Sequence, residues 1–344
     1  MFGQSKDIWT SFWNKDSSFI GFKDSNGVVR IAPKFQAFTS EIKFEDIIIV
    51  TEDSNEKRNS YYYLTKSGRM LGKDSVYRFD NGPDCESEGF IRFHDNKTDK
   101  VGMFNRNGDV AIPAEYDELT KVRNGMTIGI KGAKRKRLGE DFFWKGGKDI
   151  LIDTNNRTLI DSFRYTRNLN FFSVLVSPQP NTDSLRQNFK GINGQYYSFI
   201  DFDKEFRSWL KSSLLCNLTK DNLLKNTNKD VFFWKESNGW MSEERESFIE
   251  RNYVLIEKKL LQLKSKDCSY DIFDEDLSAY NFESAEYKDY FSTCGEAKSW
   301  IYPVKNIVIS YKDKKDLAQD NFEFLRTKDG YRLIEVSVRK DELK

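Results

Sequence analysis

A short segment recurs along the first half of the chain, and this repetition restricts the fold more than any other feature. Residues 21–35 align with residues 102–116, a weaker copy occupies residues 61–72, and a fourth candidate spans residues 150–160. A spacing of roughly 40 residues is typical of stacked supersecondary units. The positions that define the repeat and its turns are Gly21, Asn26, Gly27, Gly68, Gly102, Asn107 and Gly108.

Each copy has the composition of a β-hairpin. An Asn-Gly pair between alternating apolar residues favours a two-residue type I′ turn, because Asn and Gly both tolerate the positive φ that this turn needs. Val29 and Ile31 follow the turn on one face of the expected strand, and Pro33 is expected to end it. Since a lone hairpin is only marginally stable, we expect neighbouring units to stack and bury these faces.

The repeated units resemble WG repeats, a bacterial family of short β-rich repeats that open on Trp-Gly or Tyr-Gly. The family pattern continues through a glycine turn to Val-x-Ile-Pro-Pro-x-aromatic. Here Pro33 matches the second proline and Pro113 the first, while Ile20 and Val101 stand where the family has its aromatic residue. The resemblance covers about residues 20–176 and implies a repeat scaffold with a binding role, without catalytic residues.

The pattern changes near residue 201. Phe202, Phe206 and Trp209 recur at helical spacing, and a second helix is expected from Ser242, as its N-cap, to about Lys264. Three strand candidates follow, over residues 306–311, 322–325 and 331–336. This order of elements is similar to that of NTF2-like folds.

The sequence therefore predicts a β-rich N-terminal repeat array of antiparallel hairpins and a C-terminal α+β domain. We expect an N-terminal segment over residues 1–19, the repeat domain over residues 20–200 and the α+β domain over residues 201–344.

Charge is balanced, with 55 Lys and Arg against 54 Asp and Glu. A nucleic-acid-binding protein needs surplus positive potential, so we expect no nucleic acid and instead a protein or glycan partner. An insertion over residues 131–148 interrupts the repeat with basic and aromatic side chains, which are either partner contacts or a solvated hairpin tip. The candidate contact residues are Lys134, Arg135, Lys136, Arg137 and Trp144.

Four cysteines bear on the compartment. Cys268 and Cys294 lie in one segment and are a candidate disulfide, while four unpaired thiols remain the alternative. No run of about 18 apolar residues predicts a transmembrane segment, and no complete signal peptide opens the chain. Because Phe2-Gly3-Gln4 is typical of a chain start left after removal of an export signal, an exported or periplasmic location is slightly favoured over the cytoplasm.

Catalytic motifs are scarce. His94 is the single histidine, which excludes zinc sites built from several histidines. Cys85 beside His94 would make a nucleophile pair, but the flanking Asp84 and Glu86 raise the pKa of such a thiol and blunt it. We therefore predict no catalytic, cofactor-binding or metal-binding residue and no cofactor.

Three functions remain open, one of which is that of a purely structural or envelope-associated protein. The other two are more specific. The first is a soluble, non-enzymatic interaction module built on the β-repeat scaffold. The alternative is a small-molecule-binding or hydrolytic enzyme with its pocket in the C-terminal domain. That pocket would be lined by Trp234, Trp240 and Trp300, with buried carboxylates as acid–base groups.

Overall fold

The computed structural model of the protein describes residues 7–36, 43–52, 60–73, 75–79, 82–139, 141–164, 168–235, 237–266, 268–311, 319–338 and 343–344. The chain forms two compact units. The first comprises Met1–Thr166, Phe171–Asn181 and Asn188–Ser198, and the second comprises Arg167–Asn170, Thr182–Gln187 and Phe199–Lys344. The predicted fold class is confirmed: antiparallel sheets dominate the first part of the chain, and the C-terminal part combines helices with a mixed sheet.

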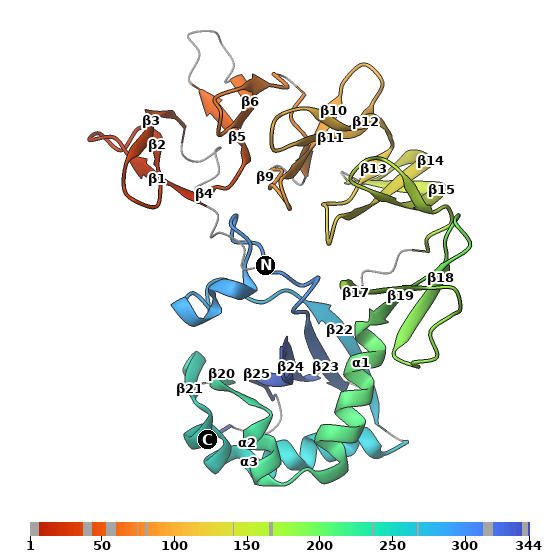
Figure 1. The fold of residues 1–344 in the computed structure, drawn as a ribbon. Helices are drawn as coiled ribbons and strands as arrows, with labels where there is room; N and C mark the ends of the chain where they lie inside the picture. The colour runs from red at the N-terminus through yellow and green to blue at the C-terminus, as the bar shows by residue number, and fades with distance from the viewer. Residues whose placement is uncertain are drawn as a thin grey trace. The chain divides into compact units, whose positions relative to one another are not determined.

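The first part of the chain forms a series of sheets in sequence order (Figure 1). The largest has the order β4 (Lys43–Phe44), β1 (Trp9–Trp13), β2 (Ile20–Lys23), β3 (Val29–Phe35), β5 (Ile47–Glu52), β6 (Ser60–Thr65), β7 (Met70–Leu71). The next has the order β10 (Phe90–Asp95), β11 (Lys100–Asn105), β12 (Val110–Tyr116), after the small pair β8 (Arg78–Phe79) and β9 (Gly82–Pro83). The sheet after that has the order β13 (Glu118–Leu119), β14 (Met126–Leu138), β15 (Asp141–Asp153), β16 (Thr158–Ile160). It is followed by a sheet with the order β17 (Leu169–Ser177), β19 (Tyr196–Asp201), β18 (Arg186–Lys190).

These hairpins bury both faces by packing on the hairpins before and after them. On β5, Ile48 and Val50 join a core with the first hairpin, whereas Ile47 and Ile49 pack with β10 and β11. The β11 strand repeats this division. Its Phe104 contacts the preceding core, while Val101 and Met103 pack with β13 and β15. Alternate side chains of one strand thus serve two successive cores, as expected for units that are stable only when stacked.

The hairpin turns share one hydrogen-bond pattern, which differs from the predicted type I′ turn. In the first, the Gly27 N–H donates to the Asp24 carbonyl and the Asp24 N–H donates to the Val28 carbonyl, both at 3.0 Å. Only Gly27 has positive φ, at 80°; Asn26 does not. This is a type I turn closed by a glycine bulge. The same pattern begins at Thr65, Asn105, Asp153 and Gly191.

The first residue of the turn explains why Asn-Gly does not adopt the two-residue form. The Asp24 carboxylate accepts from the N–H groups of Asn26 and Val28 at 2.9 Å, which holds the residues between in the right-handed conformation. Asn105 and Asp153 use their side-chain oxygens in the same way. The fourth positive-φ position is filled by Asn156, at 61°, in place of glycine.

The opening glycines of the repeat lie within strands and not at turns. A Cβ on Gly21 would lie 2.4 Å from the Ile31 carbonyl oxygen and 2.6 Å from the Pro33 nitrogen. The β2–β3 register shifts at this point, since Ile20 pairs with Phe35 but Phe22 pairs with Ile31. The extra residues bulge over the glycine.

Pro33 therefore does not end its strand as predicted. Because it lies in the bulge, its missing N–H costs no ladder hydrogen bond and β3 continues to Phe35. Pro113 in β12 has the same setting opposite Gly102.

The second unit is built on one six-stranded sheet with helices against it. The strand order is β21 (Gly239–Glu244), β20 (Thr227–Lys235), β25 (Gly330–Ser337), β24 (Gln319–Thr327), β23 (Val304–Ser310), β22 (Ser269–Glu275), in which only β20 and β25 are parallel. The helices are α1 (Phe202–Trp209), α2 (Lys220–Lys225) and α3 (Arg245–Leu261). Shorter helical turns are η2 (Leu210–Leu214), η3 (Leu215–Asn217), η4 (Gln262–Lys264) and η5 (Ala285–Tyr290).

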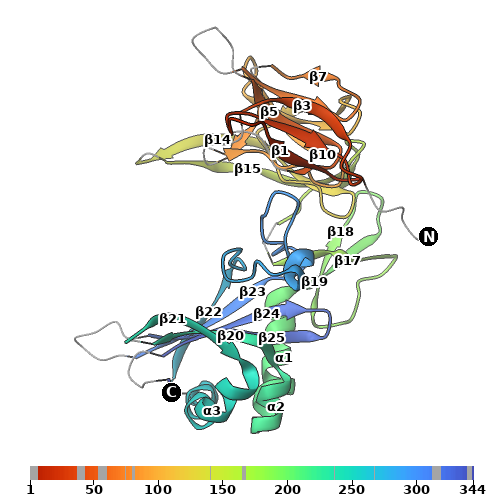
Figure 2. The same cartoon turned by 90° about the vertical axis from the view of Figure 1, so that its left-hand side faces the viewer.

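One face of this sheet is covered by the helices, and Figure 2 shows α2 and α3 lying along it. Phe206 of α1 and Phe248 of α3 pack on Phe322 and Phe324 of β24. The predicted first helix is confirmed, and Asp201 caps it by accepting from the N–H of Asp203 and of Lys204.

The predicted N-cap of the long helix is wrong. Ser242 lies in β21, paired with Phe232, and the helix begins at Arg245 after Glu244. Because Ser242 pairs in the β20–β21 ladder, the helix begins only after β21 has ended. In the described ranges, no helix is long and apolar enough to cross a membrane.

Candidate functional site

The inserted residues form a two-stranded ribbon made of the outer parts of β14 and β15. Ladder pairs run from Met126 with Asp153 out to Leu138 with Asp141. The neighbouring strands stop early, since β13 pairs only at Gly129 and Ile130 and β16 only at Leu151 and Ile152. Figure 2 shows the ribbon projecting beyond the adjacent strands. Among the described residues, no third strand pairs with the outer part of this ribbon, and the Ala133 N–H of β14 donates to the Asp117 carboxylate at 2.7 Å.

The register divides the candidate contact residues between two faces of this ribbon. Lys136 pairs with Phe143 and Lys134 with Lys145, so these side chains share one face. Arg135 pairs with Trp144, which places Arg135, Trp144 and Arg137 on the opposite face. Lys134, Arg135, Lys136 and Arg137 are exposed, Phe143 is 45% exposed and Trp144 is half-buried. The structure thus places all five predicted residues on one ribbon, with Lys134 and Lys136 on one face and Arg135, Arg137 and Trp144 on the other.

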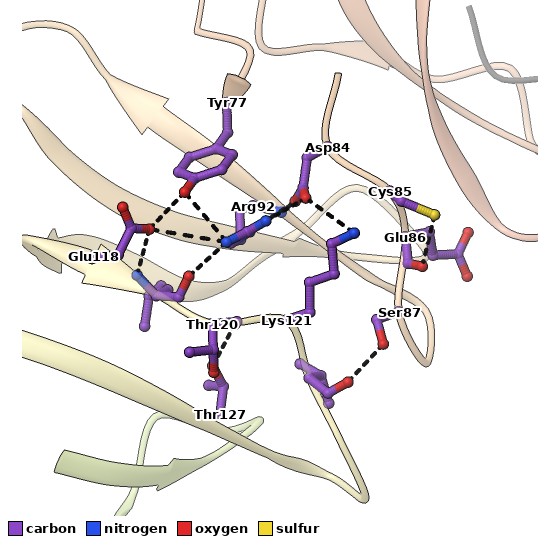
Figure 3. A network of polar contacts seen from close by, with 12 residues as sticks. Tyr77, Asp84, Cys85, Glu86, Ser87, Arg92, Glu118, Thr120, Lys121 and Thr127 are labelled. Carbon is purple, nitrogen blue, oxygen red and sulfur yellow. Dashed lines mark hydrogen bonds and ion pairs between the residues drawn. The ribbon is translucent and has the colours of Figure 1, made fainter. Parts of the chain in front are cut away.

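A second candidate is a buried polar network around Arg92, drawn in Figure 3. The guanidinium binds the Asp84 carboxylate through Nε at 3.0 Å and Nη2 at 2.5 Å. Its Nη1 donates to the Leu119 carbonyl at 2.8 Å and to the Tyr77 hydroxyl at 3.3 Å. Burial alone would raise the pKa of Asp84, but the adjacent Arg92 charge outweighs it and the pKa lies below its usual value. With its charges paired in this way, the network is structural.

Two of the three tryptophans expected around an enzyme pocket lie at the surface of the second unit. Trp234 and Trp240 face each other across the β20–β21 ladder, with ring centroids 5.6 Å apart, and are 40% and 52% exposed. Trp300 lies in the segment between β22 and β23.

A cavity of about 140 Å³ lies elsewhere in the second unit, against Glu205, Trp209, Arg326 and Tyr331. It is small beside ligand pockets, which usually measure about 300–1,000 Å³. The Arg326 guanidinium donates to the Glu205 carboxylate at 2.6 and 2.9 Å. These two charged groups of the cavity are therefore already paired with each other.

The cysteine prediction is wrong. Cys268 is a free thiol, as is Cys216, whereas Cys294 and Cys85 are disulfide-bonded. Cys268 packs against the helix-covered core of the second unit, while the loop bridged from Phe291 to Ala297 packs on the opposite face of the same sheet. The short distance in sequence between Cys268 and Cys294 gave no indication that they lie on opposite faces of the sheet. A bonded Cys85 is also unavailable as a nucleophile for His94, which contacts Asn96 and Asp99 instead.

Sequence reasoning missed a group of polar residues on the face of the second sheet that lies opposite the helices. Glu323 and Glu335 are cross-strand partners, and Asn306 is the partner of Glu323 on the other side. Burial first, and then the charges of Glu335 and Glu275, raise the pKa of Glu323 to about 8. Burial and Glu275 raise the pKa of Glu335 to about 7. Each glutamate has apolar neighbours on both sides in its strand, and this was the available signal in the sequence. That the two glutamates lie side by side follows only from the pairing of their strands.

The turn from Gly191 to Gln195 was also missed as a further copy of the repeat turn. Its Asn193-Gly194 pair was the available signal, but the β17–β19 region departs from the spacing of the other copies. In the described ranges no group of three or more His, Cys, Asp or Glu side chains is placed to hold a metal ion. No family model matches the chain, and no curated protein matches it either.

Proposed function

We propose that this protein is a non-enzymatic binding module that captures acidic, extended protein segments on the ribbon of β14 and β15. The observation that carries the proposal is the gathering of Lys134, Arg135, Lys136 and Arg137 with Phe143 and Trp144 on a projecting two-stranded element.

The two faces of the ribbon suit different parts of such a segment. On one face Lys134, Lys136 and Lys145 surround the exposed ring of Phe143. On the other, the planar Arg135 guanidinium lies opposite Trp144 and can pair a carboxylate with two parallel hydrogen bonds. Charged groups supply rapid, salt-sensitive association, while the aromatic rings supply contact area.

The backbone edges of the ribbon add a second means of attachment. Beyond Ala133, whose N–H donates to Asp117, the described residues of β14 and β15 pair with no third strand, so an extended peptide can add to the ribbon as a further strand. The stacked hairpins, which resemble WG repeats, would hold the base of the ribbon rigid. Lys131 at this base is engaged by Glu115 at 3.3 Å, whereas the basic side chains of residues 134–137 are exposed to solvent.

An acidic protein is favoured over a nucleic acid because the chain as a whole carries a formal net charge of only +1. The disulfide-bonded Cys85 and Cys294 fit an oxidising compartment, and we place the protein and its partner outside the cytoplasm.

Binding of a fluorescent Asp- and Glu-rich peptide to the full chain tests the proposal. We expect binding that weakens steeply with added salt, and a loss of about tenfold or more in affinity for K134E/K136E and for R135E/R137E. The matched control is K211E/K225E, which makes the same charge change at exposed positions of the second unit and should leave affinity nearly unchanged.

Two results would overturn the proposal. One is equal affinity of the ribbon variants and the control variant for the peptide. The basic side chains would then serve only to prevent the ribbon edges of two molecules from pairing with each other. The other is tighter binding of a DNA duplex or of heparin than of the peptide.

A further inference from the structure

A row of polar side chains crosses the sheet of the second unit on the face opposite the helices. The register joins Phe232 of β20 to Glu335, Glu335 to Glu323, Glu323 to Asn306, and Asn306 to Phe273 of β22. Directly paired residues point to the same face of a sheet, on strands about 4.8 Å apart. Three acceptors therefore stand side by side between two phenylalanines.

Asn306 provides an observation that is independent of the two carboxylates. The side chain is only 7% exposed, and its Oδ1 is buried without a hydrogen-bond partner. Leaving a buried acceptor unpaired costs roughly 1–3 kcal/mol, so such groups normally have a partner. In the described part of the chain no donor contacts the Glu323 or Glu335 carboxyl either.

The rest of this face is acidic. Pairing and alternation place Asp230 on β20, Glu244 on β21, and Asp271 and Glu275 on β22 on the same side as Glu323. The one basic side chain that the register places there, Arg332, donates to the Asn226 side chain at 3.3 Å. The segment over residues 277–302 packs on this face at Val304, Leu325 and Ile334, and its Phe282 also packs edge-on against Phe232, with ring centroids 5.0 Å apart. The charges that act on Glu323 are those of Glu335 and Glu275.

We propose that Glu335, Glu323 and Asn306 form a binding site for an alkylammonium group, with Glu323 at its centre. An ammonium ion offers three donors and no acceptor, which complements two ionised carboxylates and the unpaired Oδ1 of Asn306. Its charge offsets the repulsion between two carboxylates held as cross-strand partners. This site lies in the second unit and is independent of the ribbon.

The surroundings favour an organic cation over a metal ion. A hard divalent cation takes six or more oxygen ligands, and in the described ranges no cluster of three carboxylates is placed to hold one. Phe232 flanks the row, and Trp234, two residues further along the same strand, is 40% exposed on the same face. Aromatic rings beside a carboxylate stabilise the methylene groups and the charge of an alkylammonium ligand. A free diamine and a lysine side chain of a peptide share this chemistry.

Occupation of the site is coupled to proton release. Glu323, with a pKa of about 8, and Glu335, with a pKa of about 7, are protonated at lower pH and offer full negative charge only above these values. An alkylamine, with a pKa near ~10.4, keeps its charge throughout this range. Affinity is therefore expected to rise as the pH rises through the two carboxyl pKa values.

Isothermal titration calorimetry of the full chain with 1,4-diaminobutane, with a short lysine peptide and with calcium chloride tests the site. We expect amine binding that is about tenfold tighter well above pH 8 than well below pH 7, with protons released on binding. E323Q keeps the shape and removes the charge, and it should weaken binding by about tenfold or more. N306L should weaken it less. D271N, an exposed position on the same face, is the matched control.

The preferred amine identifies the source of the ligand, since tighter binding of the peptide indicates a protein lysine and tighter binding of the diamine a free amine. Calcium binding that displaces the amine would overturn the assignment. Amine binding that E323Q and D271N weaken equally would also overturn it, because it would reduce the effect to general surface charge. Thermal melts of each variant separate lost binding from lost folding.

Discussion

At the residue scale, the glycines of the repeat serve two different physical purposes. Gly27, Gly68 and Gly108 occupy positive-φ positions of the turns, at 80°, 84° and 79°. Gly21 and Gly102 instead lie in strands where a neighbouring backbone leaves no room for a Cβ. The first purpose is conformational and can be met by Asn, whereas the second is steric and admits only glycine.

Substitution separates these two purposes. Gly21→Ala should lower the free energy of unfolding by about 1–3 kcal/mol, because the β3 backbone must move away from the new methyl group. Gly27→Asn should change it by less than about 0.5 kcal/mol, since nothing lies within 4 Å and Asn156 already fills the equivalent position. Urea denaturation of both variants decides the matter. Equal losses would contradict the steric role of Gly21.

Glu323 supplies the pH dependence at this scale. Its pKa is about 8 in the folded chain and about 4.3 when unfolded, so folding favours the protonated form. Its contribution is most favourable below the unfolded pKa and is lost as the pH rises toward the folded pKa.

E323Q should therefore match the native protein near pH 4 to 5 and exceed its stability above pH 8 by on the order of 1–4 kcal/mol. Urea titrations at both ends of this range measure the difference. A variant that loses stability at high pH would show that Glu323 is stabilised by a partner as an anion.

At the scale of elements, each hairpin is held to its neighbours by two cores and by polar links. Glu86 accepts from the N–H groups of Asp46 and Ile47 at 2.8 Å, and Glu88 accepts from those of Asn124 and Gly125. Acidic side chains of the segment before β10 thus bind backbone donors on both adjacent hairpins. This explains how short strands remain ordered without a continuous ladder between sheets.

The Arg92 network is a stronger link of the same kind, because it joins β10, β13 and the segment that carries Asp84. Asp84→Asn should cost about 3–5 kcal/mol, since it leaves a buried guanidinium without its counter-charge. The apolar double variant D84L/R92M should lose much less than D84N. Chemical denaturation of the pair tests this, and a harmless D84N would contradict the importance of the ion pair.

At the scale of the whole molecule, near-neutral net charge conceals segregated charge. Basic side chains gather on the ribbon of the first unit, and carboxylates gather on the sheet face opposite the helices in the second. The balance of 55 basic and 54 acidic residues therefore describes neither surface. Each of the two proposed sites is tested by its own ligand and its own variants.

The cysteines give a prediction for the intact chain. Denatured but unreduced protein should react with iodoacetamide at two positions, Cys216 and Cys268, and at all four cysteines after reduction. Peptide mass spectrometry identifies the modified residues. Labelling of Cys85 or Cys294 before reduction would contradict the disulfide and with it the oxidising compartment.

Local signals in the sequence determined much of the fold. Turn residues at recurring spacing predicted the hairpins, helical periodicity from Phe202 predicted α1, and the clustered Lys134–Arg137 residues were recognisable as a candidate surface. These features depend on neighbours within a few positions, where steric limits on the backbone and the alternation of side chains decide the structure. The resemblance to WG repeats belongs to this local level and stays a prediction.

Only the tertiary structure decided which residues from distant parts of the chain meet. Register across three strands brought Glu335, Glu323 and Asn306 into one row, and burial there changed the pKa of both glutamates. Opposite faces of one sheet separated Cys268 from the loop that carries Cys294. Pairing between distant strands depends on packing summed over the whole core, which no short stretch of sequence contains.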